Sequence, residues 1–131
     1  MHFDSHQEHS PHAFDVDHEH FQADVIDASR KQPILVDFWA EWCAPCRQLT
    51  PHLNRVVNEH KGGILLAKVE VDEGENMKLA GQFRLRGFPT VILFQDGEER
   101  GRFSGSRSSH QLRDWIEQHL DGSRQAAHRA A

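Results

Sequence analysis

The sequence has very little cysteine: Cys43 and Cys46 are the only two among 131 residues. Two cysteines in one short motif cannot supply the network of disulfide bonds that holds small secreted domains together. Their number and closeness instead indicate one redox-active pair in a protein of a reducing compartment. A disulfide-stabilised scaffold is therefore excluded.

Long apolar segments and an excess of positive charge are also missing. No run is long and apolar enough to span a bilayer, and the first twenty residues lack the apolar core of a signal peptide. The formal net charge is −5, which argues against nucleic acid as a partner, and protonation of all 11 histidines would bring it to +6. We therefore expect a cytoplasmic protein that binds neither nucleic acid nor a membrane, and we expect a monomer.

The length of the chain fits one domain that needs no disulfide to hold its core. A mean hydropathy of −0.68 is low, which indicates that part of the chain lies outside that core. We expect three segments: a polar, histidine-rich, disordered tail over residues 1–11, a folded domain over residues 12–120 and a frayed tail over residues 121–131.

The histidines of the first tail allow an alternative interpretation. On a helix, the spacing of His2, His6, His9 and His12 would place them on one face, where they could hold a metal ion. Pro11 and the polar composition argue against a stable helix there. We therefore favour a solvated tail without a metal site.

Strand-like and helix-like segments alternate along the folded part, as in α/β proteins. The expected strands are residues 12–16, 34–39, 64–71, 90–95 and 99–104. The expected helices are residues 18–30, 45–60, 75–83 and a last one opened by a capping box of Ser108 and Gln111. Asp96 and Gly97 indicate a two-residue hairpin between the last two strands. The sequence thus predicts an α/β fold with a central mixed five-stranded sheet flanked by four helices.

The stretch Trp42-Cys43-Ala44-Pro45-Cys46 joins an apolar strand to a helix. At a helix N-terminus, unpaired N–H groups and the helix dipole favour the thiolate of Cys43, which is the nucleophilic form. Cys46 follows one turn later on the same face, close enough to close a disulfide. Pro45 suits the first helical turn, where its missing N–H is not needed.

Asp37 stands out because it lies in a strand that is apolar on both faces, six residues before Cys43. Burial disfavours the charged form of a carboxyl group, so we expect its pKa to be raised. A partly wetted acid near the strand end is the alternative. The closeness of Asp37 to the cysteine pair favours a functional role.

Several motifs together make the chain resemble the thioredoxin family from about His12 to Leu120. These motifs are Val36-Asp37-Phe38-Trp39-Ala40-Glu41-Trp42-Cys43, Cys46, Pro51, Ala67-Lys68, Gly87-Phe88-Pro89-Thr90, Asp96-Gly97-Glu98 and Gly105. A lone Cys-x-x-Cys also occurs in zinc sites, but zinc needs more ligands than this domain offers nearby, and we expect no metal. Ala44 stands where the commonest family pattern has glycine, which leaves the reduction potential open.

The resemblance implies a role for each matching residue. Cys43 corresponds to the exposed attacking cysteine and Cys46 to the resolving cysteine. Asp37 corresponds to a buried acid that relays a proton to or from Cys46, with Lys68 as its neighbour. Pro89 corresponds to a cis-proline that faces the disulfide. The residues expected to frame the substrate surface are Trp42, Ala44, Pro45, Phe88 and Gly105, and we expect both Trp42 and Phe88 to be exposed.

The resemblance also implies an activity. We expect a protein-disulfide reductase that performs dithiol–disulfide exchange in electron transport and cell redox homeostasis. It would use no cofactor beyond its cysteine pair, act on disulfide-containing proteins and be reduced by a flavoprotein thioredoxin reductase. The alternative is a holdase module that binds unfolded proteins, because three segments resemble thioredoxin-fold co-chaperones: residues 48–51, 82–86 and 94–97.

Overall fold

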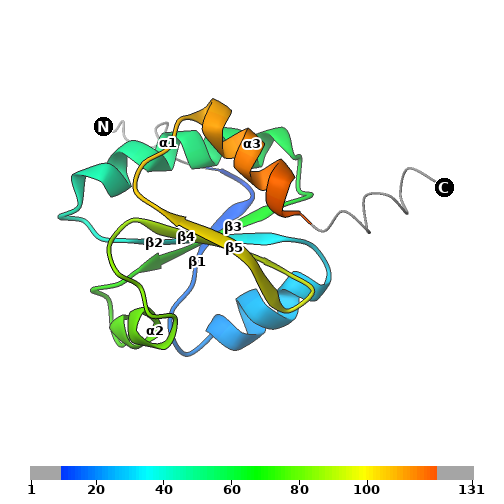
Figure 1. The fold of residues 1–131 in the computed structure, drawn as a ribbon. Coiled ribbons are helices and arrows are strands. Elements are labelled where there is room, and N and C mark those ends of the chain that lie inside the picture. The colour runs from blue at the N-terminus through cyan, green and yellow to red at the C-terminus, as the bar shows by residue number, and fades with distance from the viewer. Residues whose placement is uncertain (1–9, 121–131) are drawn as a thin grey trace.

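The computed structural model describes residues 10–120. Its centre is a five-stranded sheet in the order β1-β3-β2-β4-β5 (Figure 1). The strands are β1 (Ala13–Asp15), β2 (Ile34–Trp39), β3 (Leu65–Glu70), β4 (Thr90–Gln95) and β5 (Glu98–Ser104). β3 pairs in parallel with β1 and β2, whereas β4 pairs antiparallel with β2 and β5. The sheet is therefore mixed, as predicted.

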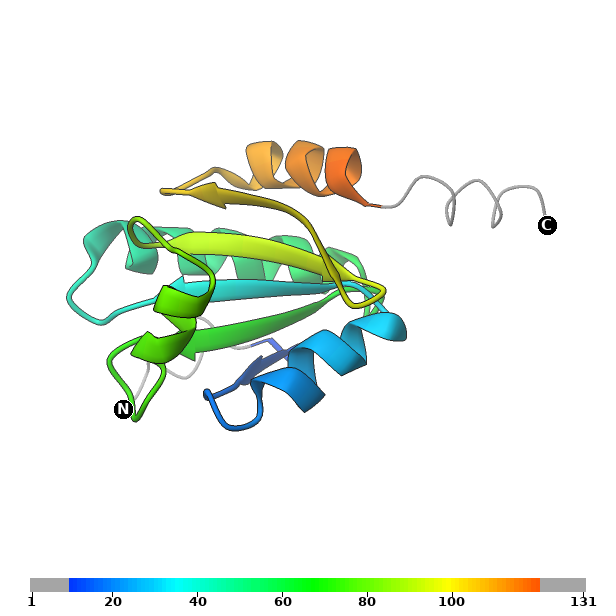
Figure 2. The same cartoon turned by 60° about the horizontal axis from the view of Figure 1, so that its bottom comes forward.

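Helices cover both faces of this sheet, as Figures 1 and 2 show. One face carries α1 (Ala44–Glu59) and α3 (Ser109–His119). The other carries α2 (Met77–Gln82) and a continuous helical segment made of η2 (Gln22–Asp27) and η3 (Ala28–Arg30). With η2 and η3 counted as one helix, the α/β prediction of five strands and four helices is confirmed.

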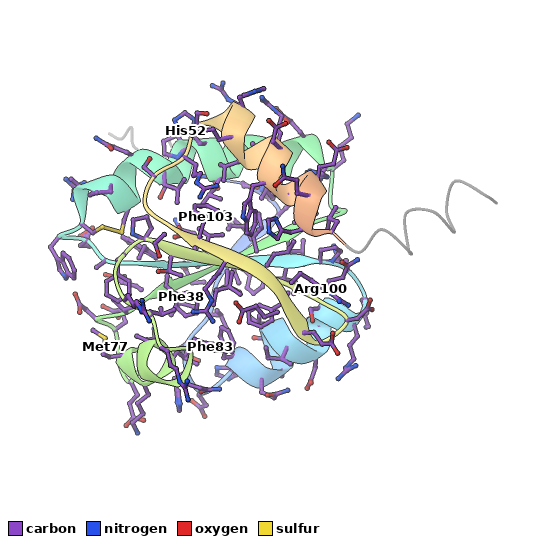
Figure 3. All side chains as sticks on the ribbon, viewed as in Figure 1. Phe38, His52, Met77, Phe83, Arg100 and Phe103 are labelled. Atoms are coloured by element: carbon purple, nitrogen blue, oxygen red, sulfur yellow. A yellow bond between two sulfur atoms is a disulfide. The ribbon has the colours of Figure 1, made fainter. Side chains whose placement is uncertain are left out.

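The core consists of two apolar clusters, one on each face of the sheet. Successive side chains of β2 point to opposite faces, so Val36 and Phe38 belong to one cluster and Leu35 belongs to the other. In Figure 3, Phe38 and Phe83 lie toward α2, and Phe103 lies toward α3. The apolar run of β2 is explained by this burial on both faces.

Two local predictions are confirmed in detail. The Ser108 side chain accepts the Gln111 backbone N–H at 3.1 Å, and the Gln111 side chain accepts the Ser108 N–H at 2.9 Å, which completes the capping box of α3. Asp96 and Gly97 have φ angles of 56° and 81°, as a two-residue hairpin turn requires.

The α-helix predicted over residues 18–30 is wrong in type and in its start. Asp17 accepts the His20 N–H at 3.0 Å, but the chain first forms a turn and then a π-helix, η2, followed by a 3₁₀ turn, η3. A Gln22–Asp27 side-chain hydrogen bond at 2.9 Å matches the five-residue spacing of a π-helix. At the other end, Ser29 accepts the N–H groups of Asp96 and Gly97, so a distant hairpin fixes where the segment ends.

The two tails predicted from the sequence lie almost entirely outside the described residues, and so do His2, His6 and His9. Ser10 is described, and its hydroxyl donates to Asn58 of α1 at 2.5 Å. The chain is therefore attached to the folded domain two residues earlier than we expected. None of the helices within residues 10–120 has the length and apolar character needed to cross a membrane.

Candidate active site

The cysteine motif lies where β2 ends and α1 begins, at the left edge of Figure 1. Cys43 is the N-cap of α1, in an extended conformation with φ −97° and ψ 103°. Its sulfur accepts the backbone N–H of Cys46 at 3.2 Å. Pro45 falls in the first helical turn, where it removes no helical hydrogen bond. A helix start thus points one of its free N–H groups at the Cys43 sulfur.

Cys43 and Cys46 form a disulfide, with their Cα atoms 5.3 Å apart, so the structure shows the oxidised state of the pair. Cys43 is only 5% exposed and Cys46 is 0% exposed. The order of accessibility is as predicted, but an openly exposed Cys43 is not found. A second loop lies against its sulfur.

That second loop holds Phe88 and Pro89, just before β4. The Phe88–Pro89 peptide bond is cis, as expected, and Pro89 is buried. The carbonyl oxygen of Phe88 lies 3.4 Å from the sulfur of Cys43. On its other side, the carbonyl of Pro89 accepts the N–H of Gly105 at 2.9 Å, and Gly105 has a φ of 91°, a conformation that favours glycine. The structure therefore brings Cys43, Pro89 and Gly105 together.

Trp42 is 65% exposed beside the disulfide, as expected. Its indole N–H donates to the carboxylate of Asp72 at 2.6 Å, and its ring meets that of Phe88 edge-on, with centres 6.2 Å apart. Phe88 is only half-exposed because its ring also packs against the core, so the expectation of a freely exposed Phe88 is wrong. Ala44 and Pro45 are exposed next to Trp42.

Asp37 is completely buried in β2, and neither of its carboxylate oxygens has a hydrogen-bond partner within the described residues. Burial raises the pKa of Asp37 to about 7, and the positive charge of Lys68 opposes part of this increase. Lys68 is the register partner of Asp37 in β3. Its ammonium group lies 5.3 Å from the centre of the Trp39 ring. A carboxyl with this pKa can take up or release a proton near neutral pH.

Sequence reasoning missed Asp72 and the contact that closes the motif loop. The guanidinium of Arg47 donates to the carbonyl of Glu41 at 2.6 Å and so ties the loop to the first turn of α1. Asp72 follows β3 and reaches Trp42 across 30 residues of sequence. Arg47 and Asp72 lie outside the motifs, so only the neighbouring ends of β2 and β3 could have pointed to Asp72.

One group of side chains within residues 10–120 has the composition of a metal site. The ligand atoms of Asp17, Glu19 and His20 lie within 4.8 Å of one another in the turn after β1. All three residues are exposed, and His20 is already paired with Asp17 at 2.8 Å. Their arrangement fits a solvated, hydrogen-bonded turn.

A mixed sheet with a Cys-x-x-Cys disulfide at the start of a helix and a cis-proline against its sulfur defines a thiol–disulfide exchange protein of the thioredoxin class. The thioredoxin family model matches residues 12–118, and the chain therefore belongs to the thioredoxin family.

Curated relatives agree with this assignment. A thioredoxin of Rickettsia felis is 38% identical over 73% of this chain and 88% of its own length. Thioredoxin C-2 of Corynebacterium nephridii is 39% identical over 78% and 91%. A probable thioredoxin-2 of Caenorhabditis elegans is 42% identical over 86% and 75%. The family and the Cys43–Cys46 pair identify a protein-disulfide oxidoreductase that performs dithiol–disulfide exchange, and none of these findings favours the co-chaperone alternative.

Proposed function

We propose that the protein reduces disulfides of protein substrates in two steps through Cys43 and Cys46. In the first step, the Cys43 thiolate attacks one sulfur of the substrate disulfide. A mixed disulfide forms between Cys43 and the substrate, and the other substrate sulfur leaves as a thiolate that takes a proton. The Cys46 N–H on the Cys43 sulfur, at 3.2 Å, supports this assignment because it stabilises the attacking thiolate.

In the second step, the Cys46 thiolate attacks Cys43 and closes the disulfide that the structure contains. The substrate leaves as its second thiol. We assign Asp37 as the group that accepts the proton of Cys46, because its raised pKa suits proton transfer near neutral pH. Lys68 lowers the pKa of Asp37 and so keeps part of it ionised.

The substrate surface consists of the exposed groups around the disulfide. Trp42, Ala44 and Pro45 present side chains on one side of Cys43. Phe88 and Gly105 contribute on the other, where Pro89 holds the Phe88 carbonyl beside the Cys43 sulfur. An extended substrate segment could form backbone hydrogen bonds with this loop, which suits recognition of many different disulfides.

Oxidised Cys43–Cys46 must regain two electrons and two protons before the next cycle. We propose that a flavoprotein thioredoxin reductase supplies them and that the cysteine pair is the only redox group of this chain. In this scheme the protein acts as a cytoplasmic monomer in electron transport and cell redox homeostasis.

Trapping of the mixed disulfide tests the two-step mechanism. In Cys46→Ser, Cys43 can still attack a substrate, but no second thiol resolves the product. Cell extract is passed over immobilised Cys46→Ser and, as the matched control, Cys43→Ser, and each column is eluted with and without dithiothreitol. We expect Cys46→Ser to retain proteins that only dithiothreitol releases, and Cys43→Ser to retain few.

A holdase would give a different result. Both variants would then bind the same proteins, and dithiothreitol would release none of them. That outcome would contradict the proposed mechanism.

A further inference from the structure

A row of charged residues crosses three neighbouring strands beside the active site. Asp15 of β1 and Asp37 of β2 are both register partners of Lys68 in β3. Register partners project from the same face of a sheet, so the Lys68 side chain starts between the two carboxylates. The N–H of Val16 donates to the carbonyl of Lys68 at 3.0 Å, which fixes β1 at this position. Lys68 therefore lies between Asp15 and Asp37 in the register of the sheet.

These two carboxylates have opposite surroundings. Asp37 is buried and its oxygens have no hydrogen-bond partner within residues 10–120, whereas Asp15 is exposed. Asp15 and Lys68 line a pocket of about 300 Å³ together with Trp39. The flexible lysine stem allows the ammonium group to lie either toward this pocket or toward Asp37.

We propose that Asp15 is a positioning residue for the exchange reaction: its carboxylate draws the Lys68 ammonium toward the pocket and away from Asp37. This inference deepens the proposed function and rests on the role assigned there to Asp37. Asp15 touches neither cysteine and acts through Lys68. With the Asp15 charge removed, Asp37 is the remaining register partner of the ammonium, and its charged form is favoured.

Other charged groups face Lys68 from the same pocket. They are Asp17 after β1, Glu70 of β3 and Glu73 of the following loop. Burial, and then the charges of neighbouring carboxylates, raises the pKa of Glu70. On the β4 side, the register partner of Asp37 is the apolar Val91. Asp15 is therefore the one pocket carboxylate in register with Lys68.

The test compares Asp15→Asn with Glu73→Gln, which removes the same charge from the same pocket but outside the row. In reduced protein, the Asp37 carboxyl is titrated by ¹³C NMR, and the pH profile of disulfide reduction is measured. We expect Asp15→Asn to lower the pKa of Asp37 by about one pH unit, because the released Lys68 ammonium moves toward Asp37, and the direct effect of one charge about two strand spacings away supplies less than half of this shift. The acidic limb of the pH profile should move to lower pH by the same amount, and Glu73→Gln should change neither quantity.

A Lys68→Met background shows whether Asp15 acts through Lys68. There, the effect of Asp15→Asn on the Asp37 titration should fall to less than half. Equal shifts in the two backgrounds, or equal shifts from Asp15→Asn and Glu73→Gln, would overturn the proposal. A shifted Asp37 titration with an unshifted pH profile would support the action of Asp15 on Asp37 and overturn the role proposed for Asp37 itself.

Discussion

Cys43 and Cys46 carry the same thiol, but their different positions at the start of α1 predict a different reactivity. The sulfur of Cys43 accepts a backbone N–H at the helix start, whereas Cys46 lies inside the first turn with no exposed surface. In reduced protein we expect iodoacetamide to modify Cys43 first, about tenfold faster or more, because only a thiolate that the reagent can reach is alkylated. Mass mapping after partial alkylation measures this order. Modification of Cys46 first would contradict the assignment of the nucleophile.

In the proposed mechanism, the buried carboxyl of Asp37 transfers a proton, and its burial lowers the stability of the fold. Its pKa of about 7, against 3.8 for an ordinary aspartate, corresponds to about 4 kcal/mol. Below pH 3.8 the carboxyl is neutral in both the folded and the unfolded chain, so burial costs no charge. As the pH rises toward 7, the unfolded chain ionises first, and the folded protein loses stability.

The substitution Asp37→Asn should therefore stabilise the fold in a pH-dependent way. We expect the variant to exceed the original protein by about 2–4 kcal/mol in free energy of unfolding at pH 8, and the gain to vanish below about pH 4. Urea unfolding of the oxidised proteins at both pH values measures it. The exposed control Glu73→Gln should show no such gain. An equal gain at pH 4 and pH 8 would show that ionisation of Asp37 is not its cause.

At the level of elements, β2 and β4 have the bounds that the sequence predicts, residues 34–39 and 90–95. Both strands are apolar runs bounded by residues that favour turns. A strand that is buried on both faces is apolar along its whole length, so its ends can be recognised in the sequence. The hairpin and the capping box were predictable for a related reason: each depends on residues at most three positions apart.

Features that depend on distant segments could not be predicted. Ser29 of η3 accepts the N–H of Gly97 in the hairpin, 68 residues further along the chain. The carbonyl that lies against the sulfur of Cys43 belongs to Phe88, which is 45 residues away. Phe88 itself adjoins a turn, which favours exposure, but its side chain is partly buried against the core.

The contact between β5 and α3 gives a test at this scale. His119 stacks on Trp115 with ring centres 4.6 Å apart, and its ring lies where a Cβ atom at Gly101 would be. We expect Gly101→Ala to lower the free energy of unfolding by about 1–3 kcal/mol, because the added methyl group displaces the imidazole. In a His119→Ala background the same change should be neutral or stabilising, since alanine suits a strand better than glycine. A double-mutant cycle by urea unfolding measures the coupling, and equal losses in both backgrounds would contradict it.

At the scale of the whole molecule, the active site is assembled from segments far apart in the sequence. The β2–α1 loop brings Cys43, the end of β3 leads to Asp72, and the loops before β4 and after β5 bring Pro89 and Gly105. These segments meet at the carboxyl ends of the central parallel strands, where α/β sheets carry their sites. The site therefore depends on the whole sheet rather than on the cysteine motif alone.

Truncation of the N-terminus tests which part of the chain the active site needs. Met1 and Phe3 are the only large apolar residues before Ser10, so the first nine residues offer little surface for packing. Ser10 differs, because its hydroxyl bonds to Asn58 and its carbonyl accepts the N–H of Ala13 at 3.1 Å. We expect a chain that starts at Ser10 to keep disulfide-reductase turnover within about twofold and its Tm within about 2 °C.

A chain that starts at His12 lacks the hydrogen bonds of Ser10. Its free energy of unfolding should fall by about 1 kcal/mol, and it should still reduce disulfides. Reduction of a model protein disulfide and thermal unfolding measure both effects, and a large loss of turnover in the first variant would place residues 1–9 in the reaction cycle.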